Sequence, residues 1–209
     1  MTIKYNRLDK ENAAVLFIDH QSGLFSLARD QNPDAFKNNI LALADLAKYF
    51  KLPSVLTTSF ENGPNGPMLP ELKAMFPDAP FIPRPGQINA WDNEDFTKAV
   101  KNTGKKQLII AGIVTDVCVT FPALSAIEAG YDVFIITDSS GTFNPITRDA
   151  AWDRMSKAGA QLMTWFAAAC ELHRDWRNDV VGIGALFANH IPDYSNLMSS
   201  FNAATAENT

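Results

Sequence analysis

A bare apolar run at Leu108–Ala111 is followed by a glycine turn and then by a helical pattern that ends at Gly130. A run of this kind, with no polar alternation, is typical of a strand buried on both faces of a parallel sheet. Cys118 falls where the helix is expected to begin. The unpaired N–H groups and the dipole at a helix start favour a thiolate, which is the nucleophilic form of cysteine. The segment therefore predicts a nucleophile at the carboxyl end of a central strand, where open α/β sheets hold their active sites.

Cys118 also has a simpler interpretation. A single cysteine beside an apolar run is usually a small buried hydrophobic residue. The choice between the two readings depends on whether other reactive residues are expected at the same edge of the sheet.

Apolar runs recur along the whole chain and predict strands at residues 13–18, 54–59, 81–83, 108–111, 132–138 and 161–164. Helical patterns lie between them, and those that follow Asn32-Pro33 and Asn144-Pro145 begin with a capping residue and a proline. Strands that alternate with helices indicate βαβ units and a parallel sheet. We therefore expect an α/β fold: a three-layer α/β/α sandwich with a central parallel sheet of about six strands, plus extra C-terminal helices.

The length of 209 residues fits a single domain, residues 1–209, with a full core. The net charge of −5, without a Lys/Arg cluster, argues against nucleic acid as a partner. The apolar runs are too short for a membrane span and the N-terminal residues lack the apolar core of a signal peptide, so we expect no membrane association. Two cysteines, Cys118 and Cys170, make no disulfide framework for this length and indicate a cytoplasmic location.

Two further reactive residues are expected at the edge that holds Cys118. Asp19 ends the first predicted strand, and Arg84 ends the third. An arginine lowers a thiol pKa through its charge, and a carboxylate can take the thiol proton and return it to a leaving group. Backbone N–H groups at the turn before Cys118 can hold an oxyanion. The combination indicates covalent catalysis on a carbonyl-like carbon.

Two segments, FIDHQ at residues 17–21 and AGIVTDVCV at residues 111–119, resemble the signatures of the isochorismatase-like cysteine hydrolase superfamily. This superfamily includes nicotinamidases and N-carbamoylsarcosine amidases, and the subgroup that the chain most resembles is the YcaC-type hydrolases. The resemblance extends over nearly the whole chain. It implies a small-molecule substrate, no cofactor and a homo-oligomer, specifically an octamer.

The resemblance also implies a role for each residue of an Asp–Lys–Cys triad. Asp19 is expected to act as general base and acid, and Cys118 to attack the substrate and form a thioester. The amides of Val114 and Cys118 are expected to form the oxyanion hole, next to a cis peptide bond at Ile113–Val114. The expected substrate-binding residues are Gln21, Phe60, Asn89 and Trp91. For Trp91, ordinary core packing is the alternative.

The chain departs from the pattern of this superfamily at the middle residue of the triad, where Arg84 replaces the expected lysine. Arginine keeps the positive charge and can bridge Asp19 and the sulfur, but it does not release a proton at ordinary pH. A structural Arg84 paired with another acid is the alternative. The replacement makes the substrate class less certain than the activation of the nucleophile.

A second departure concerns metal. Nicotinamidases hold a metal beside the triad with residues that follow the second strand, but here residues 59–63 contain no histidine. We therefore expect no catalytic metal and no nicotinamidase activity. His20, which follows Asp19, should face the opposite way, so we expect a hydrogen-bonded structural role for it.

The leading functional hypothesis is a cysteine-dependent hydrolase of a small amide, ester or related C–N substrate. Three alternatives stay open: vinyl ether hydrolysis by an isochorismatase, a non-catalytic oligomeric scaffold, and a Cys–His hydrolase that uses His173. Cys118 argues against the first, because isochorismatases usually lack this cysteine. The aromatic C-terminal helices exceed what one sheet needs, which predicts a homo-oligomer.

Overall fold

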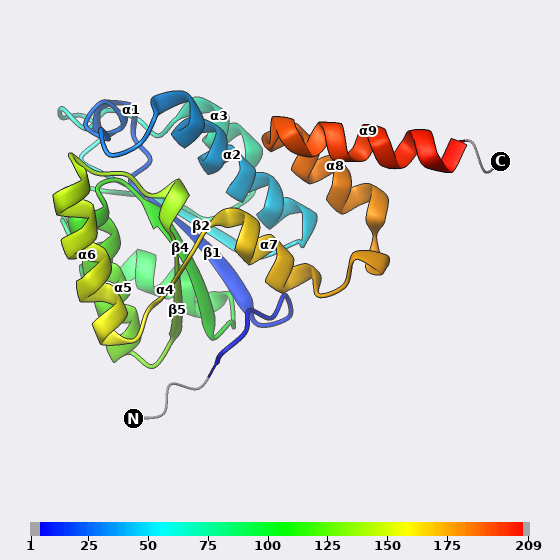
Figure 1. The fold of residues 1–209 in the computed structure, drawn as a ribbon. Helices are drawn as coiled ribbons and strands as arrows, with labels where there is room; N and C mark the ends of the chain where they lie inside the picture. Colours follow the sequence, from blue (N-terminus) through cyan, green and yellow to red (C-terminus); the bar gives the residue numbers. More distant parts are fainter. Residues whose placement is uncertain (1–4, 207–209) are drawn as a thin grey trace.

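Six parallel strands form the centre of the computed structural model, which describes residues 5–206 (Figure 1). They are β1 Ala13–Ile18, β2 Ser54–Ser59, β3 Phe81–Arg84, β4 Gln107–Gly112, β5 Asp132–Ile136 and β6 Gln161–Met163. Their order across the sheet is β3-β2-β1-β4-β5-β6, and every neighbouring pair is parallel. The predicted α/β fold and its six strands are confirmed. The fifth strand ends earlier than predicted, because Thr137–Ser139 turns into a 3-10 helix, η3.

The helices are α1 Ser22–Phe25, α2 Pro33–Tyr49, α3 Pro70–Met75, α4 Glu94–Asn102, α5 Thr120–Glu128, α6 Pro145–Ala158, α7 Trp165–His173, α8 Val180–His190 and α9 Pro192–Ala206. Shorter helical turns are η1 Ala90–Asp92, η2 Thr115–Val119 and η4 Trp176–Asn178. The predicted caps of α2 and α6 are present: the side chains of Asn32 and Asn144 accept from backbone N–H groups of the first turn. Helices α1 and α3 were not predicted, because four and six residues are too few for a helical periodicity to appear.

Side chains of the central strands point alternately into two apolar layers. Val15 and Phe17 of β1 belong to the layer that contains α2, α7 and α8, whereas Leu16 and Ile18 belong to the layer with α4, α5 and α6. Both layers consist of buried apolar side chains, which explains why the strand sequences are apolar without alternation. The predicted arrangement of helices on both faces of the sheet is therefore confirmed (Figure 1).

The order of the strands creates a switch point in the middle of the sheet. β1 pairs with β2 on one side and with β4 on the other. After β1 the chain forms β2 and β3 on one side and then β4, β5 and β6 on the other. In such sheets the loops at the carboxyl ends of the two central strands part and leave a crevice. Asp19 directly follows β1, and Cys118 lies in the turn after β4. The topology thus brings both residues to the expected edge.

The C-terminal part of the chain adds helices beyond the sandwich. Helix α8 packs on α2, and α9 packs on α8. Figure 1 shows α9, in red, extending away from the sheet on the side of α2. Among residues 5–206, no helix has the length and apolar character that a membrane crossing requires.

Candidate active site

Asp19 presents one bound and one unbound carboxylate oxygen. It lies just past β1 with a positive φ of 57°, and its N–H donates to the carbonyl of Thr57 at 2.9 Å. The side chain is fully buried. Oδ1 accepts a hydrogen bond from Nη2 of Arg84, whereas Oδ2 has no hydrogen-bond partner among the described residues. Asp19 can therefore accept a proton without giving up its ion pair.

Arg84 ends β3, two strands away from Asp19, and is one of the largest fully buried side chains. Its Nε donates to Oγ1 of Thr57 at 3.0 Å, and its Nη1 donates to the carbonyls of Gln87 and Ile88. Nη2 donates to Asp19, so the acid that Arg84 pairs with is the predicted one. The guanidinium is thus fixed by four acceptors, and its charge balances that of the buried carboxylate.

Cys118 lies inside a π-helical turn, η2, and not at the first residue of the α-helix as predicted. The N–H of Val119 donates at 3.3 Å to the carbonyl of Val114, five residues earlier, which is the hydrogen-bond pattern of a π-helix. The hydroxyl of Thr120 donates to the carbonyl of Thr115 at 2.8 Å, and Pro122 contributes no N–H to the next turn. The segment that holds Cys118 is therefore a π turn, a feature frequent at functional sites.

The electrostatics of the thiol differ from the prediction. Burial raises the pKa of Cys118, and the neighbouring Asp19 raises it further. A hydrogen bond from the Val114 backbone and the charge of Arg84 lower this pKa, but by less. The predicted lowering of the thiol pKa is therefore wrong for the resting site, because desolvation of a buried thiolate outweighs its favourable contacts.

Burial also raises the pKa of Asp19, and Arg84 opposes this effect. A carboxyl group whose pKa is shifted toward neutrality is a better proton acceptor than an exposed aspartate. The resting site therefore holds a protonated thiol beside the carboxyl group of Asp19.

The turn that leads to Cys118 contains a cis peptide bond at Ile113–Val114, as the resemblance implied. The Val114 backbone hydrogen bond to the sulfur brings one of the two predicted oxyanion-hole amides against Sγ. Whether the amides of Val114 and Cys118 stabilise an oxyanion stays a prediction.

Residues 139–141 hold this turn from the side of β5. The N–H of Gly112 donates to Oγ of Ser140 at 3.3 Å, and the N–H of Thr115 donates to the carbonyl of Gly141 at 3.0 Å. The N–H of Gly141 donates in return to the carbonyl of Gly112 at 3.3 Å. Sequence reasoning missed this support. The sequence signal for this support was the polar stretch that follows the fifth strand.

His20 supports the same segment. Its Nε2–H donates to the carbonyl of Ser139 at 3.0 Å, and burial lowers the pKa of His20 to about 4, so the ring is neutral. The ring contacts the ring of Phe17, away from the Asp19–Arg84 pair. The predicted structural role of His20 is confirmed.

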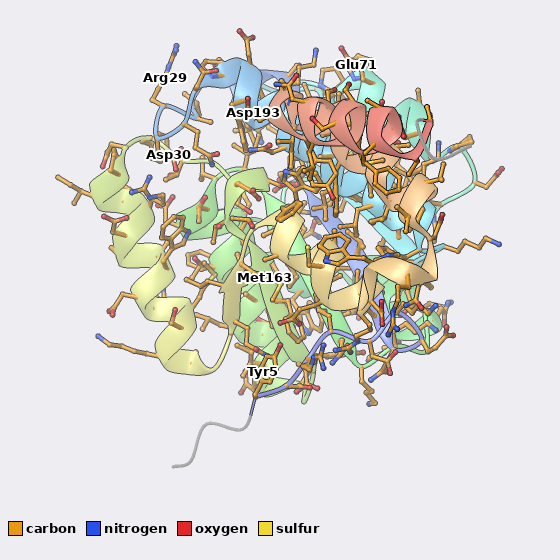
Figure 2. All side chains as sticks on the ribbon, turned by 45° about the vertical axis from the view of Figure 1, so that its right-hand side comes forward. Tyr5, Arg29, Asp30, Glu71, Met163 and Asp193 are labelled. Carbon is orange, nitrogen blue, oxygen red and sulfur yellow. The ribbon has the colours of Figure 1, made fainter. Side chains whose placement is uncertain are left out.

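His173 lies at the opposite edge of the sheet from Cys118. It ends α7, and its ring contacts the rings of Phe50 and Trp176. Figure 2 shows the two ends of the molecule: Tyr5, which precedes β1, lies at the bottom, and Arg29 and Asp30 lie near the top. Tyr5 hydrogen-bonds Glu171 of α7 at 2.8 Å, so His173 belongs to the lower end. A catalytic pair of Cys118 and His173 is therefore excluded.

Gln21, a predicted substrate-binding residue, uses its amide inside the protein. Nε2 donates to the carbonyls of Ser59 and Gly66, and Oε1 accepts from the N–H of Ser59 at 2.9 Å. These bonds tie the loop after β2 to the end of β1. Contact between Gln21 and a substrate stays a prediction, and the positioning of the loop is what the geometry supports.

The other three predicted substrate-binding residues lie on neighbouring loops. Phe60, with φ 51°, is 52 % exposed just after β2. Asn89 caps η1 by accepting from the N–H of Trp91 at 3.0 Å. The ring of Trp91 meets the rings of Phe96 and Tyr131 edge-on, which favours the packing alternative for this residue. Substrate contacts of all three stay predictions.

Metal ligands do not gather in the part of the chain that the structure describes. No three side chains of His, Cys, Asp or Glu in residues 5–206 form a group that could hold a metal ion.

Sequence comparison identifies the family. The sequence profile described as "Isochorismatase domain" matches residues 13–166, which contain Asp19, Arg84 and Cys118. The chain is 72 % identical over 207 residues to the "Probable hydrolase YcaC" of Escherichia coli (strain K12), covering 99 % of this chain and 100 % of that protein.

Two solved structures agree with the fold over nearly the whole chain. YcaC from Pseudomonas aeruginosa, solved with hexane-2,5-diol and covalent acrylamide, has 70 % sequence identity and a TM-score of 0.94. The match covers 96 % of this chain and 100 % of that one. YcaC from Escherichia coli, described as an octameric hydrolase of unknown specificity, has 73 % identity and a TM-score of 0.95. This match covers 97 % of this chain and 100 % of that one.

Proposed function

The chain belongs to the isochorismatase family and is a hydrolase of YcaC type, and from its site we propose a cysteine-dependent reaction on a small amide, ester or related C–N substrate. The observation that carries the proposal is the buried Asp19: Arg84 holds its Oδ1, its Oδ2 is not engaged by another residue, and its carboxyl group is within hydrogen-bonding reach of the thiol of Cys118. This is the arrangement of a nucleophile with an adjacent base and a group that orients the base.

The first half of the proposed reaction forms a thioester. Oδ2 of Asp19 takes the thiol proton as Sγ of Cys118 attacks the carbonyl carbon, and the carbonyl oxygen becomes an oxyanion. The amides of Val114 and Cys118 donate to this oxyanion. The C–N or C–O bond then breaks, and Asp19 returns the proton to the leaving amine or alcohol.

The second half releases the acid. Asp19 takes a proton from water, which attacks the thioester carbon through a second oxyanion. The C–S bond breaks and the proton returns to the sulfur, which restores the resting thiol. Arg84 keeps its charge throughout and holds Asp19 in both protonation states.

A relative supports the nucleophile. YcaC from Pseudomonas aeruginosa was solved with covalent acrylamide, and acrylamide is an electrophile that adds to thiolates. A vinyl ether hydrolase would not need a buried thiol beside a base, so the arrangement of Cys118 and Asp19 argues against that alternative.

The alkylation of Cys118 by iodoacetamide at pH 7, followed by peptide mass spectrometry, tests the proposal. Cys170 is the internal control, because burial alone raises the pKa of this second free thiol. We expect Cys118 to react at least about ten times faster than Cys170, and Asp19→Asn to slow only Cys118. Equal slow rates for the two cysteines, unchanged by Asp19→Asn, would instead support a non-catalytic scaffold.

We also propose that the chain forms a homo-oligomer, as YcaC of Escherichia coli forms an octamer. The support within this chain is an apolar groove of about 410 Å³ between α7, α8 and α9, where Trp176, Leu197 and Phe201 are 45–56 % exposed. An exposed apolar surface of this kind is typical of an interaction site. Light scattering at micromolar concentration should give eight times the mass of one chain, and a monomeric mass would refute the proposal.

We further propose a cytoplasmic location. The support is the pair of unpaired cysteines, Cys118 and Cys170, both of which are free thiols.

A further inference from the structure

Thr142, on the segment that follows β5, is fully buried and joins three parts of the chain. Its N–H donates to Oδ1 of Asp30 at 2.8 Å, and its carbonyl accepts from the N–H groups of Arg29 and Asp30 at 2.8 and 3.2 Å (Figure 2). Its hydroxyl donates to Oδ1 of Asp116, in the π turn η2, at 2.7 Å. The loop after α1 and the nucleophile turn are therefore both fastened to this one residue.

Asp116 carries the support of the nucleophile turn further than the backbone does. Among the described residues, the backbone bonds between this turn and the segment after β5 end at Thr115, whose N–H donates to the carbonyl of Gly141 at 3.0 Å. Asp116 is the next residue, and its bond to Thr142 brings the support one residue closer to Cys118. A hydroxyl that donates to a carboxylate makes a strong side-chain hydrogen bond.

The same clasp also links the nucleophile to its base. Asp19 begins the stretch of chain that leads through α1 to Asp30. Thr142 binds the far end of this stretch with its backbone and the nucleophile turn with its side chain. The carboxyl group of Asp19 is within hydrogen-bonding reach of the thiol of Cys118, and proton transfer requires that this reach be kept. A displacement of about 1 Å at a reacting group is enough to slow a reaction strongly.

We propose that Thr142 is a positioning residue for the proposed reaction: its hydroxyl holds Asp116, and with it the π turn, in the register that keeps Sγ of Cys118 beside the base. The inference rests on the proposed function, because Thr142 acts through the nucleophile. It differs from a contribution to stability alone, since it predicts a loss of reactivity at one of the two thiols in a chain that stays folded.

Four variants separate the hydrogen bond from the residues that make it. Thr142→Val keeps the shape of the side chain without the hydroxyl, and Thr142→Ser keeps the hydroxyl. Asp116→Asn keeps an oxygen that can accept from Thr142, whereas Asp116→Leu keeps the size without an acceptor. Thr147→Val is the matched control, because the hydroxyl of Thr147 donates at 3.2 Å to Oδ1 of Asn144 on the exposed start of α6.

The measurement is the rate at which acrylamide alkylates Cys118 at pH 7, read by peptide mass spectrometry with Cys170 in the same sample as the reference. In this reaction the sulfur forms a C–S bond to the β-carbon, the electrons of the C=C bond move to the α-carbon, and that carbon takes the thiol proton. Nothing leaves, and no other reagent is required. Urea unfolding of each variant is measured alongside, so that stability and reactivity are compared in the same proteins.

We expect Thr142→Val and Asp116→Leu to slow Cys118 by at least about tenfold relative to Cys170, because the sulfur is no longer held beside the base. Thr142→Ser and Asp116→Asn should stay within about threefold of the wild-type rate, since each keeps the hydrogen bond. Thr147→Val should leave the rate unchanged. A role in stability alone predicts another pattern, in which a loosened fold exposes both thiols and raises both rates.

The outcomes separate the positioning role from the proposed function. A wild-type rate at Cys118 in Thr142→Val would overturn the positioning role and leave the nucleophile intact. Equal changes at the two cysteines, or a rate in Thr142→Ser as low as in Thr142→Val, would overturn it as well. If Thr142→Val does not fold, the comparison of Asp116→Leu with Asp116→Asn decides the same question. A Cys118 that does not react in the wild-type protein would overturn the proposed function together with the inference.

Discussion

The two cysteines of this chain lie in regions that differ in almost everything except burial. Cys118 lies at the carboxyl edge of the sheet, where Asp19, Arg84 and the Val114 backbone all act on its thiol. Cys170 lies on α7, and burial alone raises its pKa. His173, three residues further along the helix, lines the same cavity of about 160 Å³ as Cys170.

The comparison separates a thiol with an acid beside it from a thiol without one. Cys170 has an imidazole nearby, but the acids of that region are engaged elsewhere: Asp175 with Arg177, and Asp179 with Tyr49 and the N–H of Gly182. Cys118 has a carboxylate whose second oxygen is unpaired. The proposed function therefore assigns the nucleophile to Cys118, which has an acid held in place beside it, and not to Cys170, which has a histidine nearby.

The largest difference between the two regions should appear when each thiol is removed. Cys118→Ala should abolish turnover of any amide or ester substrate, because no other group can carry the acyl intermediate, while Cys170→Ala should retain turnover within about twofold. Both variants should fold, since alanine fits a small buried position. Turnover is measured with the same substrate, and retained activity in Cys118→Ala would falsify covalent catalysis by this residue.

The next largest effect concerns the ion pairs of the two regions. Arg84→Leu should destabilise the protein by about 3–5 kcal/mol, because it leaves the buried Asp19 without its partner. Arg84→Lys should lose much less, since the charge remains. Arg177→Leu, which breaks the exposed pair with Asp175, is the control and should unfold at nearly the wild-type urea concentration. Similar urea midpoints for Arg84→Leu and Arg177→Leu would show that the buried pair has no special role in stability.

The smallest expected effect concerns Asp138, a half-buried acid at the same edge of the sheet as Asp19. Burial raises the pKa of Asp138 to about 6, and its Oδ1 accepts from the N–H of Trp165 at 3.0 Å. Between about pH 4 and pH 6 the folded state keeps a proton that the unfolded state has lost. Folding stability should therefore fall as pH rises through this window, by on the order of 1–3 kcal/mol.

Asp138→Asn should remove this fall and keep the hydrogen bond to Trp165. Urea unfolding of both proteins at pH 4.5 and at pH 7 measures the difference. An identical change in stability for wild type and Asp138→Asn would contradict the prediction. Activity should persist in Asp138→Asn, since this acid caps a helix and Asp19 is the proposed base.

The fold, and the placement of Asp19, Arg84 and Cys118 at one edge of the sheet, could be predicted from sequence because both depend on local patterns. Apolar runs alternating with helical periodicity specify the parallel sheet, and parallel strands align their carboxyl ends. Asp19, Arg84 and Cys118 each come at or just after the end of such a run, so their meeting at one edge followed from the strand positions alone.

The remaining features of the site depend on three-dimensional contacts that a sequence pattern does not contain. The direction of the Cys118 pKa shift is decided by how much water the folded protein removes from the sulfur. The π turn arises from the combined effect of Thr120, Pro122 and the turn before them. The bonds of Gln21 depend on where a proline-rich loop folds back, which propensity does not determine.

The strand order also has a consequence for how the protein is made. β1 leaves the ribosome first, but both of its neighbours in the sheet, β2 and β4, are synthesised after it. Asp19 meets Arg84 only 65 positions later in the sequence, and Cys118 later still. Contacts this distant in sequence form late, once the intervening chain has been ordered. A nascent chain that stops before β4 therefore contains Asp19 but not Cys118, and the two residues come together only after β4 has been synthesised.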